Sequence, residues 1–189
     1  MTTLAPYHII SYATLLGTTL FQTFVNTKVC HSALPKSAFT TLQKRIFPIY
    51  FRCQTFLLVL TALTFPPGGP ASLVKEKRDW IPFAIAGVTA VLNLLVYGPR
   101  TRQAMIDRIH QGMSWLEPRH SGGDTNMQYE ETRDAKLPNT VDEISPDMQA
   151  CRRRFSRNHA MSIHLNLISI FAMVWYGVRL ASRLNIEME

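Results

Sequence analysis

Amide, hydroxyl and imidazole side chains recur at helical spacing inside apolar stretches, and they are the groups that could do chemistry. His159, Ser162 and Asn166 are three and four positions apart, which places them on one face of a helix. Asn93 and Gln22 stand inside two other apolar stretches. In lipid an unpaired polar group is costly, so such side chains turn toward the interior of a helix bundle. The candidate polar interior is therefore Gln22, Asn93, His159, Ser162 and Asn166.

Two interpretations fit this polar interior. The side chains can hydrogen-bond between helices, at about 0.6–2 kcal/mol per pair, and hold the bundle together. Alternatively, they line a polar cavity for a small substrate, an ion or a proton. Packing is favoured, because amides and hydroxyls can satisfy one another and four helices enclose little volume.

Catalysis has little support in the sequence. His159 is the best single candidate, because histidine titrates near neutral pH and can relay protons or bind a metal. His164 follows five positions later, about 140° further around a helix, so the two rings do not share a face. The chain has no convincing zinc spacing, phosphate loop or nucleophile motif, and its apolar stretches contain no Asp or Glu. We therefore expect no catalytic residue, no metal site, no cofactor and no pump that uses buried acids.

Four apolar stretches have to position these groups. They cover about residues 7–25, 47–65, 80–97 and 162–180, each close to the ~20 residues that a helix needs to cross a bilayer core. The mean hydropathy of +0.01 hides them, because a long polar segment offsets their signal. Helices that are apolar all round belong in a large core or a membrane, which argues against a small soluble protein. The chain is predicted to be an all-α integral membrane protein, a single four-transmembrane-helix bundle over residues 1–189 with a partly disordered cytoplasmic insert at 117–149.

Charge placement predicts the orientation of the chain. The net charge is +7, and Lys and Arg concentrate in the segments 27–46 and 98–161. The positive-inside rule places both segments in the cytoplasm and both termini on the lumenal or extracellular side. No positive residue precedes the first stretch, so it is expected to be a retained span of an endomembrane or plasma-membrane protein.

A basic cluster precedes the fourth stretch and consists of Arg152, Arg153, Arg154 and Arg157. Basic residues beside the cytoplasmic leaflet attract anionic lipid, at about 1 kcal/mol per charge. Contact with lipid explains the positive charge without a nucleic acid partner. The bilayer and its anionic lipid are the expected partners, whereas homo-oligomerisation and protein partners are left open.

Two local features concern the ends of the spans. Pro48 is expected in the first turn of the second span, where its missing N–H would be unpaired in any case. After Gly98, apolar residues recur near helical spacing. This pattern fits either an amphipathic helix on the membrane surface or a cytoplasmic extension of the third span.

Three blocks of sequence carry a family resemblance. They are Leu34-Pro35 to Phe39 with Leu42-Gln43 and Phe47-Pro48-Ile49-Tyr50-Phe51, then Pro99-Arg100-Thr101 with Ala104-Met105, and then Arg154-Phe155 with His159, Ser162 and Asn166-Leu167. In this order they resemble the transmembrane protein 205 family. The resemblance implies a small eukaryotic four-span membrane protein, whose human relative is associated with tolerance to platinum drugs and with vesicle trafficking. It implies no catalytic residues, because none are defined for the family.

The matching residues cluster at the cytoplasmic ends of the predicted spans. We expect them to meet in one packed constellation, formed by Gln43, Pro48, Pro99, Thr101 and His159.

Three functions follow from these observations. The first is movement or export of a small solute or a metal–drug complex, for which the soft sulfur atoms of Cys30, Cys53 and Cys151 are suitable ligands. The alternative is a trafficking or scaffold protein that recruits partners or anionic lipid through its basic surface. A membrane-embedded enzyme that uses His159 ranks third, because no partner constellation accompanies the histidine.

Overall fold

The computed structural model describes residues 4–114 and 146–183, and every element in them is helical. The chain begins with α1 (Ala5–Leu20), which passes through a π-helical segment η1 (Phe21–Asn26) into α2 (Thr27–Ala33) without a break in helical backbone angles. Leu34 is extended, and α3 (Lys36–Leu63) follows. The remaining elements are α4 (Pro70–Lys75), α5 (Lys77–Leu92), the π-helical η2 (Asn93–Tyr97), α6 (Gly98–Ser114) and α8 (Pro146–Arg183).

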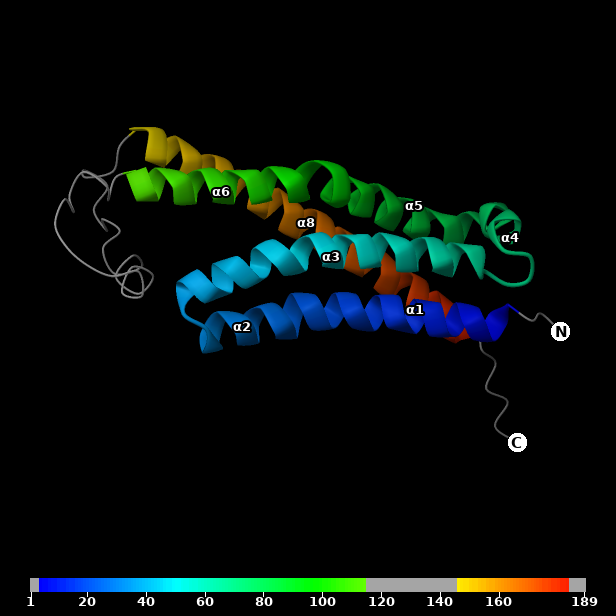
Figure 1. Cartoon of the computed structure of the whole chain (residues 1–189). Coiled ribbons are helices and arrows are strands. Elements are labelled where there is room, and N and C mark those ends of the chain that lie inside the picture. Colours follow the sequence, from blue (N-terminus) through cyan, green and yellow to red (C-terminus); the bar gives the residue numbers. More distant parts are fainter. Residues whose placement is uncertain (1–3, 115–145, 184–189) are drawn as a thin grey trace.

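These elements form four long helical rods that run up and down in an elongated bundle (Figure 1). The start of α1, the short α4 and the end of α8 lie at one end of the bundle. The helix α2, the last turns of α6 and the first turns of α8 lie at the other end (Figure 1). Helix α3 packs along α1, and α8 packs along α5 and α6. Side chains from both pairs of rods therefore meet along the bundle axis.

Three helices in the described part of the chain are long and apolar enough to cross a membrane: Lys36–Leu63, Lys77–Asp107 and Pro146–Arg183. They contain the predicted spans 80–97 and 162–180 and residues 47–63 of the predicted span 47–65. The first predicted span, 7–25, is helical but is not among the three, because polar residues such as His8 and Gln22 lower its hydropathy. The structure thus supports an integral membrane protein with three candidate spans and adds a fourth rod of more polar composition.

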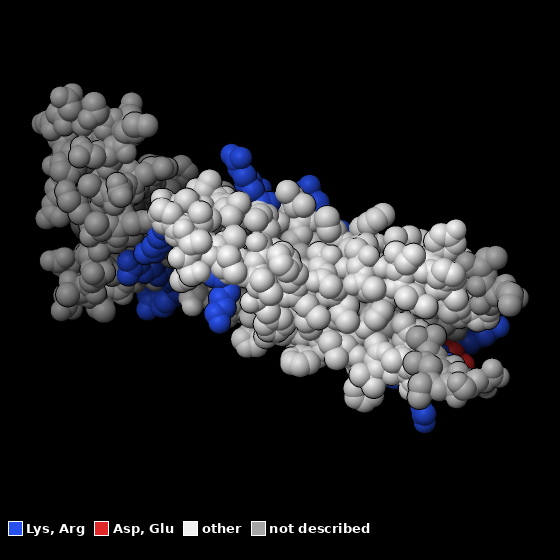
Figure 2. Space-filling model, turned by 90° about the horizontal axis from the view of Figure 1, so that it is seen from below, with Lys and Arg blue, Asp and Glu red and all other residues white. Residues whose placement is uncertain are grey.

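The outer surface of the rods is apolar. Ile10, Phe56, Leu95 and Phe171 come from four different rods, and each is 65–70% exposed. In Figure 2 most of the visible face is free of charged side chains, which project from its edges and near its two ends. An exposed apolar surface of this extent marks contact with a membrane or a partner and is uncommon on soluble monomers. It agrees with the lengths of the helices and supports the assignment to a membrane.

The apolar core lies in the half of the bundle nearest α4. Tyr176 is 1% exposed and packs edge-on against Phe83, with the ring centroids 4.8 Å apart, and against Tyr12 at 5.3 Å. Gly177 lets α1 approach α8 closely, because a Cβ atom at this position would collide with the Tyr12 hydroxyl. Tyr12 in turn donates a hydrogen bond to the Met173 carbonyl oxygen, at 2.8 Å. Close packing of these rings ties the first rod to the last.

Some predicted boundaries are wrong. Helix α3 starts at Lys36, so Pro48 stands well inside a helix and not in its first turn. Of the two interpretations of the segment after Gly98, the extension of the third span is confirmed, because helix α6 continues from η2. Helix α8 begins at Pro146, so residues 146–149 belong to a helix and not to the polar insert. The rest of the predicted insert, 117–145, lies outside the described residues.

Candidate functional site

Asn166 is the meeting point of three rods. Its Oδ1 accepts hydrogen bonds from the Tyr50 hydroxyl at 2.7 Å and from Gln54 Nε2 at 3.3 Å, both on α3. Its Nδ2 donates to Thr23 Oγ1 in η1, at 2.8 Å. Asn166 is 8% exposed, so these bonds replace contacts with solvent. The amide therefore joins α8 to the first and second rods.

The third rod reaches the same level through Asn93 in η2. Asn93 is 1% exposed, and its Nδ2 donates to the Ser162 carbonyl oxygen at 3.1 Å. Gln54 Nε2 also lies 3.4 Å from Ser169 Oγ. We call this group the polar centre; its residues are Gln22, Thr23, Tyr50, Gln54, Asn93, Ser162, Asn166 and Ser169.

Both π-helical segments carry residues of the polar centre. η1 holds Gln22 and Thr23, and η2 begins at Asn93. In η1 the Gln22 carbonyl oxygen accepts hydrogen bonds from the backbone N–H of Thr27 and from the Thr27 hydroxyl, the latter at 2.8 Å. π-helical turns are rare and occur frequently at functional sites, since the wider turn redirects side chains. Here they bring the Thr23 hydroxyl of the first rod and the Asn93 amide of the third rod to α8.

The polar centre has unused hydrogen-bonding capacity. Gln22 Nε2, Gln54 Oε1 and Asn93 Oδ1 are buried and have no partner among the described residues. A buried polar atom without a partner costs about 1–3 kcal/mol, so native structures rarely leave several together. Further toward α2, both amide atoms of Gln43 and the Thr101 hydroxyl are also buried without a partner. The interior therefore offers both donors and acceptors to a polar guest.

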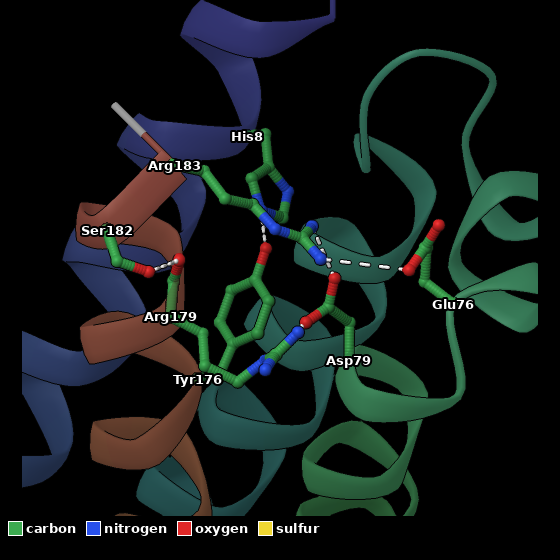
Figure 3. Close-up of polar contacts among 7 residues, drawn as sticks. All are labelled: His8, Glu76, Asp79, Tyr176, Arg179, Ser182 and Arg183. Atoms are coloured by element: carbon green, nitrogen blue, oxygen red, sulfur yellow. Dashed lines mark hydrogen bonds and ion pairs between the residues drawn. The ribbon is translucent and has the colours of Figure 1, made fainter. Parts of the chain in front are cut away.

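A second polar group closes the end of the bundle near α4 (Figure 3). Asp79 on α5 is fully buried, and its Oδ1 accepts a hydrogen bond from Arg179 Nε at 2.8 Å. Its Oδ2 pairs with Arg183 Nη1 at 2.5 Å, while Glu76 is 3.8 Å from the same guanidinium group. The two arginines compensate the charge of the buried carboxylate and hold α5 to the end of α8.

His8 lies beside this ion-pair cluster and connects three rods. Its Nδ1 is 2.9 Å from the Thr61 carbonyl oxygen, and its Nε2 is 2.5 Å from the Tyr176 hydroxyl (Figure 3). A carbonyl oxygen can only accept, so Nδ1 carries the proton of a neutral ring. Nε2 is then the acceptor, and Tyr176 donates to it. The imidazole is fully buried and, in this arrangement, has both ring nitrogens satisfied.

Of the predicted interior residues, Gln22, Asn93, Ser162 and Asn166 are buried. His159 is half-buried, and its ring stacks on Phe155 with the centroids 5.3 Å apart. The neighbouring Asn158 takes the buried position on this turn of α8. The structure thus brings four of the five residues into the interior and leaves His159 at its margin.

The expected constellation of family-motif residues is wrong for Pro99, which is exposed on the outer face of α6. Gln43 is buried, whereas Pro48, Thr101 and His159 are half-buried. The reason is helical geometry, because residues two positions apart, such as Pro99 and Thr101, lie on different faces of one helix.

The basic cluster lies on the first turns of α8. Arg153, Arg154 and Arg157 are exposed, and Arg152 is half-buried. The three cysteines carry no disulfide: Cys53 is exposed, and Cys30 and Cys151 are half-buried. Among the described residues, no group of three or more His, Cys, Asp or Glu side chains could hold a metal ion.

Sequence reasoning missed several of these residues. Tyr50 and Gln54 are four positions apart in the second span, which a search for a polar partner in every span would have found. His8 stands three positions before Ser11, on the same helix face. No Asp or Glu lies within the predicted spans, yet Asp79 directly precedes the span 80–97 and is buried inside α5, where the sequence pattern did not indicate a buried acid. Its pairing with Arg179 depends on a contact between distant segments.

A protein-family model with the description Domain of unknown function (DUF4149) matches residues 10–110, more than half of the chain. The chain belongs to the DUF4149 family. The DUF4149 match includes the parts of the polar centre on η1, α3 and η2, whereas Asn166 on α8 lies beyond it. Xanthocillin biosynthesis cluster protein D of Aspergillus fumigatus is 42% identical over 181 residues, which cover 96% of this chain and 91% of that relative. No solved structure matches the chain.

Proposed function

We propose that this DUF4149 protein moves a small polar solute across its membrane through the polar centre. One observation carries the proposal: all four rods send amide or hydroxyl groups to one level of the bundle, where buried atoms of Gln22, Gln54 and Asn93 remain unpaired. A network that served packing alone would be expected to satisfy all its members, because a partly satisfied buried network is destabilising. Unpaired hydrogen-bonding atoms in the interior are suited to transient binding of a polar solute.

The chemistry of the polar centre narrows the class of solute. Its side chains are uncharged and include both hydrogen-bond donors and acceptors. They match a small neutral or zwitterionic molecule, while oxygen and amide groups are poor ligands for soft metal ions. None of the three cysteines belongs to the polar centre. We therefore favour a small organic solute over a metal–drug complex.

The relatives support an association with small molecules. The name of the 42% identical Aspergillus protein places that protein in a xanthocillin biosynthesis cluster. The sequence also resembles the transmembrane protein 205 family, whose human relative is associated with tolerance to platinum drugs. Export or transfer of a small molecule is a role that fits both relatives.

A path across the membrane requires the first rod to be a fourth span. Its consecutive segments have 16, 6 and 7 residues, and at about 1.5 Å per residue they exceed the ~30 Å of a bilayer core. Its polar residues His8, Ser11 and Gln22 are buried, whereas Phe21 and Phe24 are exposed. This arrangement, with polar groups inside and apolar groups outside, suits a span in a bundle. With four spans, the positive-inside rule predicts that both termini lie on the lumenal or extracellular side.

Solute flux into liposomes that contain the purified full chain tests the proposal. The panel comprises glycerol, urea, glycine and a platinum complex. We expect flux of at least one organic solute, and a loss of at least tenfold in Asn166→Leu. Thr14→Val is the matched control, because Thr14 is exposed and its hydroxyl bonds only within its own helix, to Ile10 O at 2.8 Å.

Two results would refute this function. One is the absence of flux of every solute from protein that retains its helical circular dichroism and has inserted. The other is an equal loss of flux in Asn166→Leu and Thr14→Val. In either case the polar centre would be a packing element.

A second function, recruitment of partners or anionic lipid, draws on the exposed Arg153, Arg154 and Arg157. Replacing all three by Gln separates the two functions. If the solute function holds, this variant keeps its flux and still complements a deletion of the gene, while Asn166→Leu does neither. Recruitment would be favoured if Asn166→Leu complemented the deletion and the triple arginine variant did not.

A further inference from the structure

A groove on the outside of the bundle, between α5 and α8, is separate from the polar centre. Its volume is about 690 Å³, within the range of roughly 300–1,000 Å³ of small-molecule sites. Ile81 and Ile85 line it from α5, and Phe171 and Trp175 line it from α8. These four side chains are 41–70% exposed, so the groove opens to the surroundings of the bundle.

Two arginines, Arg78 on α5 and Arg179 on α8, complete the lining. Both stand toward the α4 end of their helices, and the apolar residues follow in the direction of the bundle centre. On α8 the lining reaches from Arg179 to Ile168, which is roughly 16 Å at about 1.5 Å per residue. The groove thus has a cationic head and an apolar tail.

The cationic head carries more positive charge than its carboxylates compensate. Arg179 and Arg183 share the buried Asp79, and Glu76 is 3.8 Å from Arg183. Arg78 is exposed and forms no ion pair with any residue that the structure describes. Arg179 donates to Asp79 through Nε, and its terminal amino groups have no hydrogen-bond acceptor among the described residues, so they can donate to a bound anion. An anion at this place would meet two guanidinium groups.

We propose that this groove binds one anionic phospholipid, with its phosphate at Arg78 and Arg179 and an acyl chain along Ile85, Phe171 and Trp175. Arginine matches phosphate through its planar fork of N–H donors. An indole side chain prefers the level of the lipid headgroups, where Trp175 would cover the glycerol end of the chain. A lipid fits this groove better than a soluble ligand, because the apolar part opens sideways along helices that are long and apolar enough to cross the membrane.

The predicted orientation makes this a demanding site. Bulk anionic lipid is concentrated in the cytoplasmic leaflet, whereas the α4 end is expected on the opposite side. Occupancy must therefore come from the groove itself and not from a general surface attraction. A preference for anionic over zwitterionic lipid, measured at the single indole of Trp175, tests directly whether the groove itself binds lipid.

Quenching of Trp175 fluorescence by brominated lipids measures this lipid preference. The full chain with Trp80→Phe and Trp115→Phe keeps Trp175 as its one indole. It is reconstituted in phosphatidylcholine vesicles that contain the same small fraction of either brominated phosphatidylglycerol or brominated phosphatidylcholine. We expect at least fivefold stronger relative binding of the phosphatidylglycerol, in keeping with one basic contact near the bilayer surface.

Variants assign the effect to the groove. Arg78→Gln is expected to remove most of the fivefold preference. Lys75→Gln removes the same charge from an exposed residue of α4 that does not line the groove, and should retain it. Ala172→Leu fills the groove and should weaken binding of phosphatidylglycerol, whereas Ala13→Leu adds the same atoms to an exposed position of α1 and should not.

Three outcomes would overturn the proposal. Equal quenching by the two lipids would indicate ordinary bilayer contact. An equal loss of preference in Lys75→Gln and Arg78→Gln would indicate a diffuse surface charge. Weak quenching by both lipids would indicate that a second copy of the chain covers the groove. None of these variants touches the polar centre, so the result is independent of the proposed solute function.

Discussion

Replacement of Asp79 by Asn tests whether the buried carboxylate holds the end of the bundle together. Asp79 is 0% exposed and bonds Arg179 at 2.8 Å and Arg183 at 2.5 Å. Asparagine keeps the shape of the side chain but removes its charge. Glu76→Gln is the matched control, because Glu76 faces the same Arg183 at 3.8 Å while its side chain is 60% exposed.

The structure sets the size of the expected effect. Breaking a fully buried ion pair costs about 3–5 kcal/mol, because the remaining charge is left without water. Here the side chains of Arg179 and Arg183 are 24% and 45% exposed, so both guanidinium groups can be hydrated again. We therefore expect Asp79→Asn to lower the free energy of unfolding by about 2 kcal/mol, below that upper bound. The exposed pair of Glu76 should contribute no more than about 0.5 kcal/mol.

Reversible unfolding in mixed detergent micelles, followed by far-ultraviolet circular dichroism, measures both variants. The double-mutant cycle of Asp79→Asn with Arg179→Gln should show coupling of at least about 1 kcal/mol, as expected for residues in direct contact. A loss below 0.5 kcal/mol for Asp79→Asn would show that the buried ion pair does not hold α5 to α8. A similar loss in Glu76→Gln would lead to the same conclusion.

Two further comparisons test the packing of α8. Gly177→Ala should lower the free energy of unfolding by about 1–3 kcal/mol, because the added methyl group collides with the Tyr12 hydroxyl, whereas Gly17→Ala has nothing within 4 Å and should be neutral or stabilising in the same unfolding assay. Met173→Ala should cost about 2–5 kcal/mol through the cavity it leaves at a 2% exposed position, while Phe171→Ala at a 70% exposed position should cost less than about 0.5 kcal/mol. Equal losses in Gly177→Ala and Gly17→Ala would show that the close contact of Gly177 with Tyr12 is assigned wrongly. Equal losses in Met173→Ala and Phe171→Ala would show that the inward and outward faces of α8 are assigned wrongly.

The helices and their amide groups are predictable from the sequence, but the inward faces are only partly so. The series Ser11, Thr14, Thr18 and Gln22 has the spacing of one helix face, yet Thr14 points outward while Tyr12 and Leu15 are buried. In a bilayer both the lipid and the interior accept apolar residues, so hydropathy does not distinguish the two sides of a span. A threonine can also bond to its own helix backbone, as Thr14 does, and then needs no interior partner.

The polar centre is likewise only partly predictable from the sequence. Asn93 and Asn166 are recognisable in the sequence, because amides are rare and costly inside apolar spans. The partners of Asn166, which are Thr23, Tyr50 and Gln54, depend on the order of the rods and on the π-helical turns. A π turn has no strong sequence signal, and it rotates every later side chain relative to a regular helix.

By itself, the sequence determined that this chain is helical, belongs in a membrane and carries amide groups within its spans, because composition and periodicity control helix formation and partition into lipid. Tertiary structure decided that Asn166 joins three rods, that Asp79 is buried between Arg179 and Arg183, and that an apolar groove ends at Arg78. These features require contacts between residues far apart in the sequence. Asp79 and Arg179 are 100 positions apart, and Thr23 and Asn166 are 143 positions apart. Only the packing of the rods against one another brings such residues together.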